Sequence, residues 1–192
     1  MKYLDFLKCM FFIPHLLIFL LKKDKKMNQD LVFWEKCCIT YRRKRHWQSF
    51  LLILSHLPEN RTLFYYRLGL ISRLLSLYAP NQTSLYINVM RNNFSGGCFF
   101  QHAYSTIVLA KNIGSNVQIW QNVTIGKKFP GGGIPTIGNN VKIFAGAVVV
   151  GEISIGNGVT IGANSVVTKS IPAGVTVAGA PAKIIYTCNN VS

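Results

Sequence analysis

The chemistry available to this chain rests on few residues, and His102 is the first of them. His15, His46 and His56 precede it, so His102 is the one histidine beyond position 56. A neutral imidazole can take a proton from a hydroxyl group near pH 7, and such a general base accelerates a reaction about 10²- to 10⁴-fold. From the residues alone, a structural role as a hydrogen-bonded histidine stays open.

Acidic residues are almost absent from the same region. No Asp or Glu lies between Glu59 and Glu152, which excludes a carboxylate-pair mechanism inside the repeat domain and a carboxylate-rich metal site. One histidine cannot complete a three-histidine zinc site, and the five cysteines lack metal-ligand spacing. We therefore expect no metal. The odd number of cysteines also predicts a reducing compartment, the cytoplasm.

An aliphatic residue returns at every sixth position over most of the C-terminal half. This period fits neither a helix nor an ordinary strand, and it is typical of a parallel β-helix, in which each short strand sends one aliphatic side chain inward. The positions in this phase are Ile107, Ile113, Ile119, Ile125, Ile137, Ile143, Val149, Ile155, Ile161 and Val167. A second set expected inside the prism is Val117, Val123, Val141, Ala147, Val159 and Ser165.

One stretch interrupts the repeat. The segment KKFPGGGIPT (127–136) replaces one hexapeptide, and the period resumes in the same phase at Ile137. Loops carried on rigid scaffolds often build binding sites. The segment therefore predicts a loop beside a site, with a tolerated surface insertion as the alternative.

The composition changes near Pro80. Residues 1–80 are rich in Leu, Phe, Lys and Arg and place apolar residues at helical spacing, whereas residues 81–192 carry the hexapeptide repeats. We expect two domains: a helical segment (1–80) that serves in capping, assembly or membrane association, and a β-helix domain (81–192).

Residues 1–26 form an apolar stretch that ends in the lysine cluster KKDKK. The apolar run is short for a membrane span and lacks a cleavage motif. Two interpretations remain: a peripheral helix whose lysines attract anionic lipid at the inner face of a membrane, and an apolar helix packed on its neighbours. The formal net charge of +15 comes with no nucleic-acid-binding motif, so no nucleic-acid partner is expected.

Residues from about 88 to 186 resemble the hexapeptide-repeat acyltransferases, most closely the serine acetyltransferases and their polysaccharide O-acetyltransferase relatives. The resemblance rests on SGGCFFQHA (95–103), IGSNVQIWQNVTIG (113–126), the glycine-rich loop and IGANSVVTKSIPAGVTVAGAPAKII (161–185). It implies a mainly β fold, a left-handed parallel β-helix preceded by α-helices. It also implies an enzyme that uses acetyl-coenzyme A, in which His102 is the catalytic general base.

The resemblance implies that the cofactor lies in a groove between subunits of a homotrimer, with a dimer of trimers as a further form. Lysines can neutralise phosphates, and small residues allow close approach of a flexible chain. The resemblance implies cofactor-binding roles for residues that include two lysines of the glycine-rich loop and one lysine of the C-terminal tail. These residues are Gly126, Lys127, Lys128, Ala145, Ala163, Gly179 and Lys183.

Departures from the family concern the acceptor. The serine acetyltransferases have an aspartate before the catalytic histidine, where this chain has Gln101, and the aspartate that orients the histidine has no counterpart, although Asn88 lies close to its place. A buried amino-acid zwitterion needs charged partners, whereas a sugar hydroxyl needs only hydrogen bonds, which Gln101, Tyr104 and Asn122 offer. We therefore expect an acetyl-CoA-dependent O-acetyltransferase of a sugar or surface-polysaccharide precursor. Serine O-acetyltransferase and an inactive assembly module are the alternatives.

Overall fold

The computed structural model describes residues 9–38 and 45–187. Helices occupy the N-terminal part, and short strands follow from residue 85 onward. The helices are α2 (Ile13–Lys22), α3 (Lys25–Cys37), α4 (His46–His56), α5 (Pro58–Leu68) and α6 (Ser72–Tyr78), with the 3₁₀ turns η2 (Gly69–Ile71) and η3 (Arg91–Asn93).

Local sequence explains where these helices begin. Asp24 caps α3, because its carboxylate accepts hydrogen bonds from the backbone N–H groups of Lys26 and Met27. Pro14 and Pro58 lie in the first turns of α2 and α5, where a missing N–H costs nothing. Among the described residues, no helix is long and apolar enough to cross a membrane.

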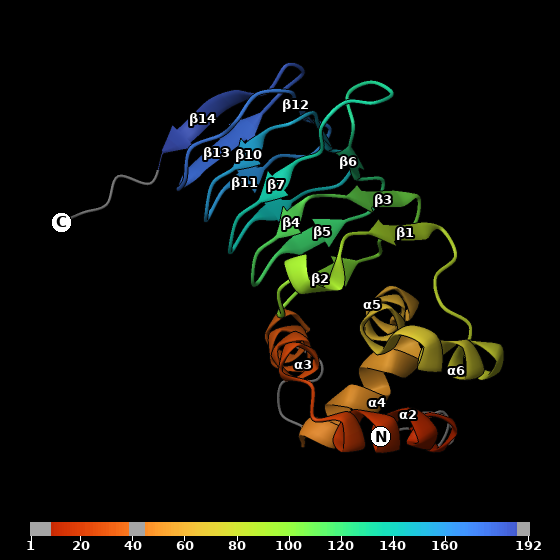
Figure 1. Cartoon of the computed structure of the whole chain (residues 1–192). Coiled ribbons are helices and arrows are strands. Elements are labelled where there is room, and N and C mark those ends of the chain that lie inside the picture. The colour runs from red at the N-terminus through yellow and green to blue at the C-terminus, as the bar shows by residue number, and fades with distance from the viewer. Residues whose placement is uncertain (1–8, 39–44, 188–192) are drawn as a thin grey trace.

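The strands stack into three parallel sheets that form the faces of a prism (Figure 1). Among the described strands, β14 alone runs antiparallel to its neighbour, β13. Sheet A holds β1 (Leu85–Asn88), β3 (Thr106–Leu109), β6 (Thr124–Gly126), β9 (Val148–Val150) and β12 (Val166–Val167). Sheet B holds β4 (Asn112–Ile113), β7 (Thr136–Ile137) and β10 (Ser154–Ile155). Sheet C holds β2 (Phe99–Gln101), β5 (Gln118–Trp120), β8 (Lys142–Ile143), β11 (Thr160–Ile161), β13 (Val175–Ala178) and β14 (Lys183–Thr187).

The predicted parallel β-helix is confirmed, and its core has the predicted composition. The aliphatic residues from Ile113 to Val167 in the six-residue phase are all buried, and so is the second set from Val117 to Ser165. Pairing follows the repeat, since Ile119 lies opposite Ile143 and Ile125 opposite Val149. Stacked coils thus bury a continuous core that one coil could not form.

The prediction for Ile107 is wrong. Its side chain is exposed, and Val108 takes the inward position opposite Ile125. The preceding corner, from His102 to Ser105, contains two residues with positive φ, 49° at His102 and 51° at Ser105. This corner shifts the inward-facing position by one residue, from Ile107 to Val108. The inward positions follow the six-residue repeat from Ile113 onward.

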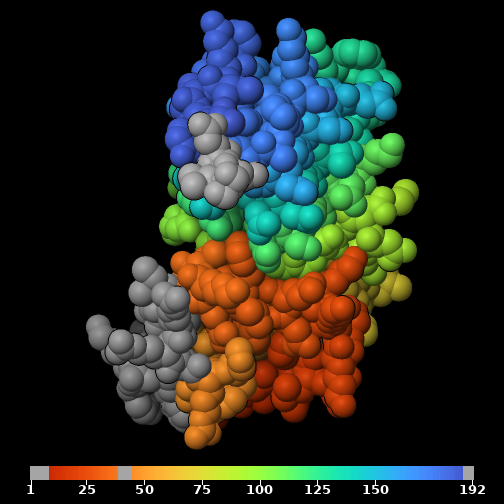
Figure 2. All heavy atoms as spheres, turned by 90° about the vertical axis from the view of Figure 1, so that its left-hand side faces the viewer, coloured from red at the N-terminus to blue at the C-terminus, as the bar shows by residue number. Residues whose placement is uncertain are grey.

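The helices cover the open end of the prism at its first coil (Figures 1 and 2). In Figure 2, α3 lies directly against the first coil of the prism. Trp34 of α3 donates a hydrogen bond from its indole Nε1 to the carbonyl of Cys98 at 2.7 Å. Asn60 of α5 exchanges two hydrogen bonds of 3.2 Å with the backbone of Phe100 in β2. Side chains from the helices therefore form hydrogen bonds with backbone groups that would otherwise pair with a preceding coil.

A buried ion pair joins the same parts. The Asp30 carboxylate accepts hydrogen bonds from Arg67 Nε at 3.0 Å and from the backbone N–H groups of Gly97 and Cys98 at 2.7 and 3.0 Å. Arg67 also donates to the carbonyl of Phe94 at 2.7 Å. One carboxylate and one guanidinium thus link α3, α5 and the first coil.

Candidate active site

His102 lies at the corner between β2 of sheet C and β3 of sheet A. Its backbone is in the left-handed region, and its side chain is exposed. The imidazole has no hydrogen-bond partner among the residues that the structure describes. An exposed ring without a structural partner is available to a bound substrate, which favours the predicted role as a base over a structural one.

Glu59 holds the backbone of this corner. Its buried carboxylate, at the start of α5, accepts a hydrogen bond from the His102 backbone N–H at 3.0 Å. The His102 carbonyl in turn accepts from the Tyr104 N–H at 2.7 Å. Sequence reasoning missed Glu59 as a site residue, because 43 positions separate it from His102. The one sequence feature that could have pointed to Glu59 is that it is the last acidic residue before the region without Asp or Glu.

Asn88 does not orient His102 in this structure. Asn88 lies on β1, and its side-chain amide donates to the Tyr86 hydroxyl at 3.4 Å. The amide therefore belongs to the surface of sheet A. The carboxylate that contacts the catalytic candidate is Glu59, and it bonds the backbone rather than the ring.

A hollow of about 230 Å³ lies beside His102. Gln101 and His102 line it from the β-helix, and Glu59, Cys37 and Cys38 line it from the helices. Burial raises the pKa of Cys37 and the pKa of Cys38 to about 11. Both thiols are therefore protonated at neutral pH and poorly suited to act as nucleophiles.

Several predicted site residues share one edge of the prism with His102. This edge, where sheet C passes into sheet A, is built by backbone hydrogen bonds from one coil to the next. They join Asn122 N–H to Tyr104 O (3.1 Å), Asn164 N–H to Ala145 O (2.9 Å) and Val166 N–H to Gly179 O (2.9 Å). The predicted residues on this edge are Tyr104, Asn122, Ala145, Ala163 and Gly179, with Gln101 beside it at the end of β2.

The loop residues lie elsewhere. Gly126 ends β6, and Lys127 and Lys128 follow it at the edge where sheet A passes into sheet B, where the loop projects from the prism (Figure 1). Lys127 and Lys128 are exposed. Sheet A separates this edge from His102 within one chain, so the structure does not bring the loop lysines to the catalytic candidate.

Lys183 lies at the far end of the prism, at the start of β14. It lines a hollow of about 240 Å³ together with Lys169. Two ammonium groups beside one hollow suit a phosphorylated ligand, because both can donate to phosphate oxygens. Within the described ranges, no group of three or more His, Cys, Asp and Glu residues is placed to hold a metal ion.

The edge of the prism has the shape that a long, flexible thioester substrate needs. Ala145, Ala163 and Gly179 carry small or no side chains, so no bulky group stands between the edge and a chain that lies along it. His102 stands at one end of this row, and Lys183 lies near the other. The arrangement can hold an extended chain along the edge, with its reactive end at an imidazole.

A parallel β-helix built from six-residue repeats defines the class of hexapeptide-repeat transferases. Residues 134–169 match the family described as "Bacterial transferase hexapeptide (six repeats)". The chain is 36% identical over 135 residues to a serine acetyltransferase of Helicobacter pylori strain J99, a match that covers 69% of this chain and 75% of the relative. The chain belongs to the serine acetyltransferase family. It spans only 42 to 52% of the length of several other curated relatives.

Solved structures agree with this family assignment. A Neisseria gonorrhoeae serine acetyltransferase in complex with serine is 27% identical, with a TM-score of 0.61, and the match covers 85% of this chain and 70% of that one. A Brucella abortus serine acetyltransferase in complex with coenzyme A is 25% identical, with a TM-score of 0.60, and the match covers 90% and 73%.

Proposed function

We propose that the chain is an O-acetyltransferase that moves an acetyl group from acetyl-coenzyme A to a hydroxyl acceptor, with His102 as the general base. The observation that carries this proposal is the exposed His102 imidazole at the end of a row of small residues on one edge of the prism. Family membership supports the same reaction, because the Brucella abortus relative was solved with coenzyme A.

In the proposed reaction, the His102 imidazole accepts the proton of the acceptor hydroxyl as its oxygen attacks the thioester carbonyl. The new bond is an ester, and the bond that breaks is the thioester carbon–sulfur bond. The imidazolium then returns the proton to the departing sulfur, which leaves as the free thiol of coenzyme A. Glu59 keeps the His102 backbone in its left-handed conformation, so the ring stays directed outward at the corner.

Ala145, Ala163 and Gly179 are proposed to bind the pantetheine arm through their backbone groups, and Lys183 to bind phosphate. Gly126, Lys127 and Lys128 can join the same site only from a neighbouring subunit, because they lie across sheet A from His102. This separation supports a homotrimer in which the loop edge of one subunit faces the His102 edge of the next. Light scattering tests this assembly, and a monomer at micromolar concentration would contradict it.

Serine is the acceptor that the comparisons favour over the sugar expected from the sequence. Curated relatives are named serine acetyltransferases, and one solved relative contains serine. The structure also supplies a charged group that the sequence did not suggest, since the Glu59 carboxylate lines the hollow beside His102. One of its oxygens bonds the His102 N–H, and the other is proposed to bind the ammonium group of an amino acid.

A sugar hydroxyl remains the second candidate because the side chains nearest His102 on the β-helix are neutral. Gln101 lines the hollow, and Tyr104 and Asn122 lie next to each other at the corner. In this alternative, these side chains bind the acceptor through hydrogen bonds, and Glu59 serves only to hold the backbone.

Release of coenzyme A thiol from acetyl-coenzyme A tests the function directly. L-serine, L-threonine and a panel of free and nucleotide-linked sugars would be compared as acceptors at equal concentration. We expect thiol release that depends on serine. Thiol release that depends on a sugar and not on serine would select the second candidate, and no acceptor-dependent release would contradict the proposed reaction.

A further inference from the structure

The helical segment exposes an apolar surface that the β-helix does not use. Helix α2 and the η2–α6 segment lie side by side, because Phe11 stacks on Tyr78 at 3.8 Å and Leu21 shares a hollow with Ile71. The start of one element therefore lies beside the end of the other. We call this the α2–α6 face, and its most prominent side chains are Leu17, Leu21, Leu70, Ile71, Leu74 and Leu77.

The exposure of these leucines is unusually high for so many neighbouring apolar residues. Leu21 is 81% exposed and Leu77 is 86% exposed. Leu70, Leu74 and Leu77 are spaced to form one stripe along η2 and α6. A contiguous apolar surface of this kind marks an interaction site rather than a solvent-facing one.

Cations gather at the end of the face where Leu21 meets Ile71. Lys22 and Lys23 end α2 there, and Arg73 lies on α6. Arg91 approaches from the other side, with its guanidinium over Gly69, so close that a Cβ at that glycine would collide with it. The apolar surface thus carries a positive rim at one end.

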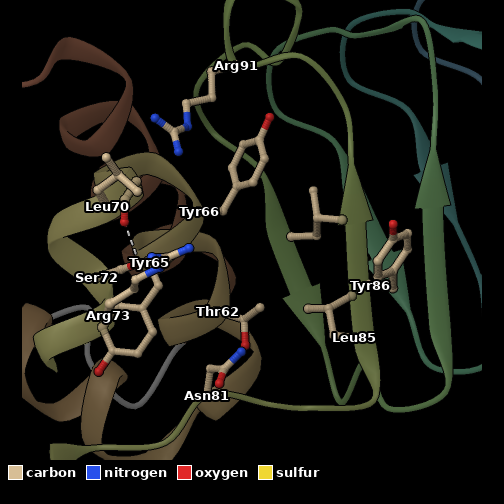
Figure 3. A pocket seen from close by; sticks show the side chains of 12 residues that line it. Thr62, Tyr65, Tyr66, Leu70, Ser72, Arg73, Asn81, Leu85, Tyr86 and Arg91 are labelled. Carbon is tan, nitrogen blue, oxygen red and sulfur yellow. Dashed lines mark hydrogen bonds between the residues drawn. The ribbon is translucent and has the colours of Figure 1, made fainter. Parts of the chain in front are cut away.

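A hollow of about 430 Å³ opens at this rim, between the helices and β1 (Figure 3). Arg73, Arg91, Tyr86 and Asn81 line it, and exposed Leu70 lies at its border. Figure 3 shows Arg91 and Arg73 reaching the hollow from different elements. Two guanidinium groups and neutral donors around one hollow suit a phosphate group.

Among the carboxylates in the described part of the helical segment, Asp24 alone adjoins these cations, since it follows Lys23 and caps α3. Asp30 pairs with Arg67 inside the protein, Glu35 lies 2.9 Å from His46, and Glu59 bonds His102. A second copy of the chain would therefore bring the four cations Lys22, Lys23, Arg73 and Arg91 to the interface with one carboxylate. An anionic surface complements the face instead.

We propose that the α2–α6 face rests on an anionic lipid bilayer, with the leucines in the acyl region and a lipid phosphate in the hollow between Arg73 and Arg91. Apolar residues on one face beside lysines and arginines are typical of helices that lie in the plane of a membrane surface. This contact does not depend on which acceptor the catalytic site uses.

Co-sedimentation of the purified full chain with vesicles tests the proposal. Vesicles of phosphatidylcholine alone are compared with vesicles that also contain phosphatidylglycerol, at low and high salt. We expect binding to the anionic vesicles, weaker binding at high salt, and little binding to phosphatidylcholine alone. Equal binding to both kinds of vesicle, or no binding to either, would overturn the proposal.

Three double variants, each checked for folding by circular dichroism, locate the surface. Leu74→Gln with Leu77→Gln should weaken binding about tenfold, because both side chains are proposed to enter the acyl region. Arg73→Gln with Arg91→Gln should weaken it about fivefold for each cation removed. Ile184→Gln with Ile185→Gln is the matched control on β14, where both side chains are also exposed, and it should bind as the unaltered chain does.

Sedimentation equilibrium of the same variants separates a contact between copies from a membrane contact. We expect the leucine variant to keep the mass of the unaltered chain. If the leucine variant instead forms a smaller assembly, and the unaltered chain ignores anionic vesicles, the face is an interface between copies and the proposal is wrong.

Discussion

The Glu59 carboxylate on α5 accepts a hydrogen bond from the backbone N–H of His102 at 3.0 Å. This contact joins the helical segment to the His102–Ser105 corner of the β-helix. The helices therefore shape the candidate site as well as cover the open end of the prism. A substitution at Glu59 should change the kinetic constants of the enzyme.

Glu59 should have two separable effects. Glu59→Ala removes the acceptor for the His102 N–H, and displacement of the corner should lower kcat about 10²-fold. Glu59→Gln retains an oxygen for this bond but loses the negative charge. If serine is the acceptor, Glu59→Gln should raise KM for serine about tenfold with a smaller change in kcat. Steady-state kinetics check both, and an unchanged KM in Glu59→Gln would count against a role in binding the ammonium group.

Removal of Asp30 from its buried pair with Arg67 should strongly destabilise the fold. Asp30→Ala leaves the Arg67 charge buried without its partner, along with two backbone N–H groups of the first coil. Loss of one partner of a buried pair costs about 3–5 kcal/mol in the free energy of unfolding. Urea denaturation measures this loss. Arg73→Ala, an exposed substitution in the same segment, should change stability by less than about 0.5 kcal/mol.

His15 should make the helical segment sensitive to acid. Burial, with the nearby Arg61 charge, lowers the pKa of His15 to about 4 from an ordinary 6.5. The folded protein thus takes up this proton less readily than the unfolded chain, so stability is full above pH 6.5 and declines as the pH falls toward 4.

The variant His15→Phe removes this titration while it keeps an aromatic ring. Tyr65, which lies 2.8 Å from His15 Nε2, still donates to the Ala79 carbonyl at 2.7 Å. The fall in thermal midpoint between pH 6.5 and pH 4 should therefore be smaller in the variant than in the unaltered chain. Parallel curves for the two proteins would show that His15 does not carry this dependence.

Lys127, Lys128 and Lys183 should affect use of acetyl-coenzyme A more than use of the acceptor. Phosphates need positive charge, whereas hydroxyl groups do not. Alanine at each position should raise KM for acetyl-coenzyme A about tenfold, the loss expected for one hydrogen bond to a charged group. Lys36→Ala, an exposed lysine of α3, serves as the control. A raised KM for the acceptor alone would contradict the assignment.

The repeat made the β-helix predictable, because a period of six leaves no other regular backbone that could bury the aliphatic residues from Ile113 to Val167. Prediction failed at Ile107, where the His102–Ser105 corner shifts the inward position to Val108. Positive φ at non-glycine residues gives no clear pattern in the sequence, so the shift was visible only in the structure.

The candidate site was predictable on the β-helix and not on the helices. The positions of His102, Asn122 and Ala145 could be predicted from the repeat and the resemblance. The six-residue register stacks the corners of successive coils on one edge of the prism. Glu59 could not be found in this way. Its contact depends on how α5 packs against β2, and that packing is set by tertiary interactions such as those of Asn60 and Phe100.

The turnover number of His102→Asn tests the central claim most directly. An asparagine keeps a hydrogen-bonding side chain at this corner, and it tolerates the left-handed backbone of His102, but its amide cannot accept the proton. With the variant folded and in the same assembly as the unaltered chain, kcat with the best acceptor should fall about 10²- to 10⁴-fold, and KM for acetyl-coenzyme A should change little. A kcat equal to that of the unaltered chain would contradict the mechanism, since the imidazole would then be structural.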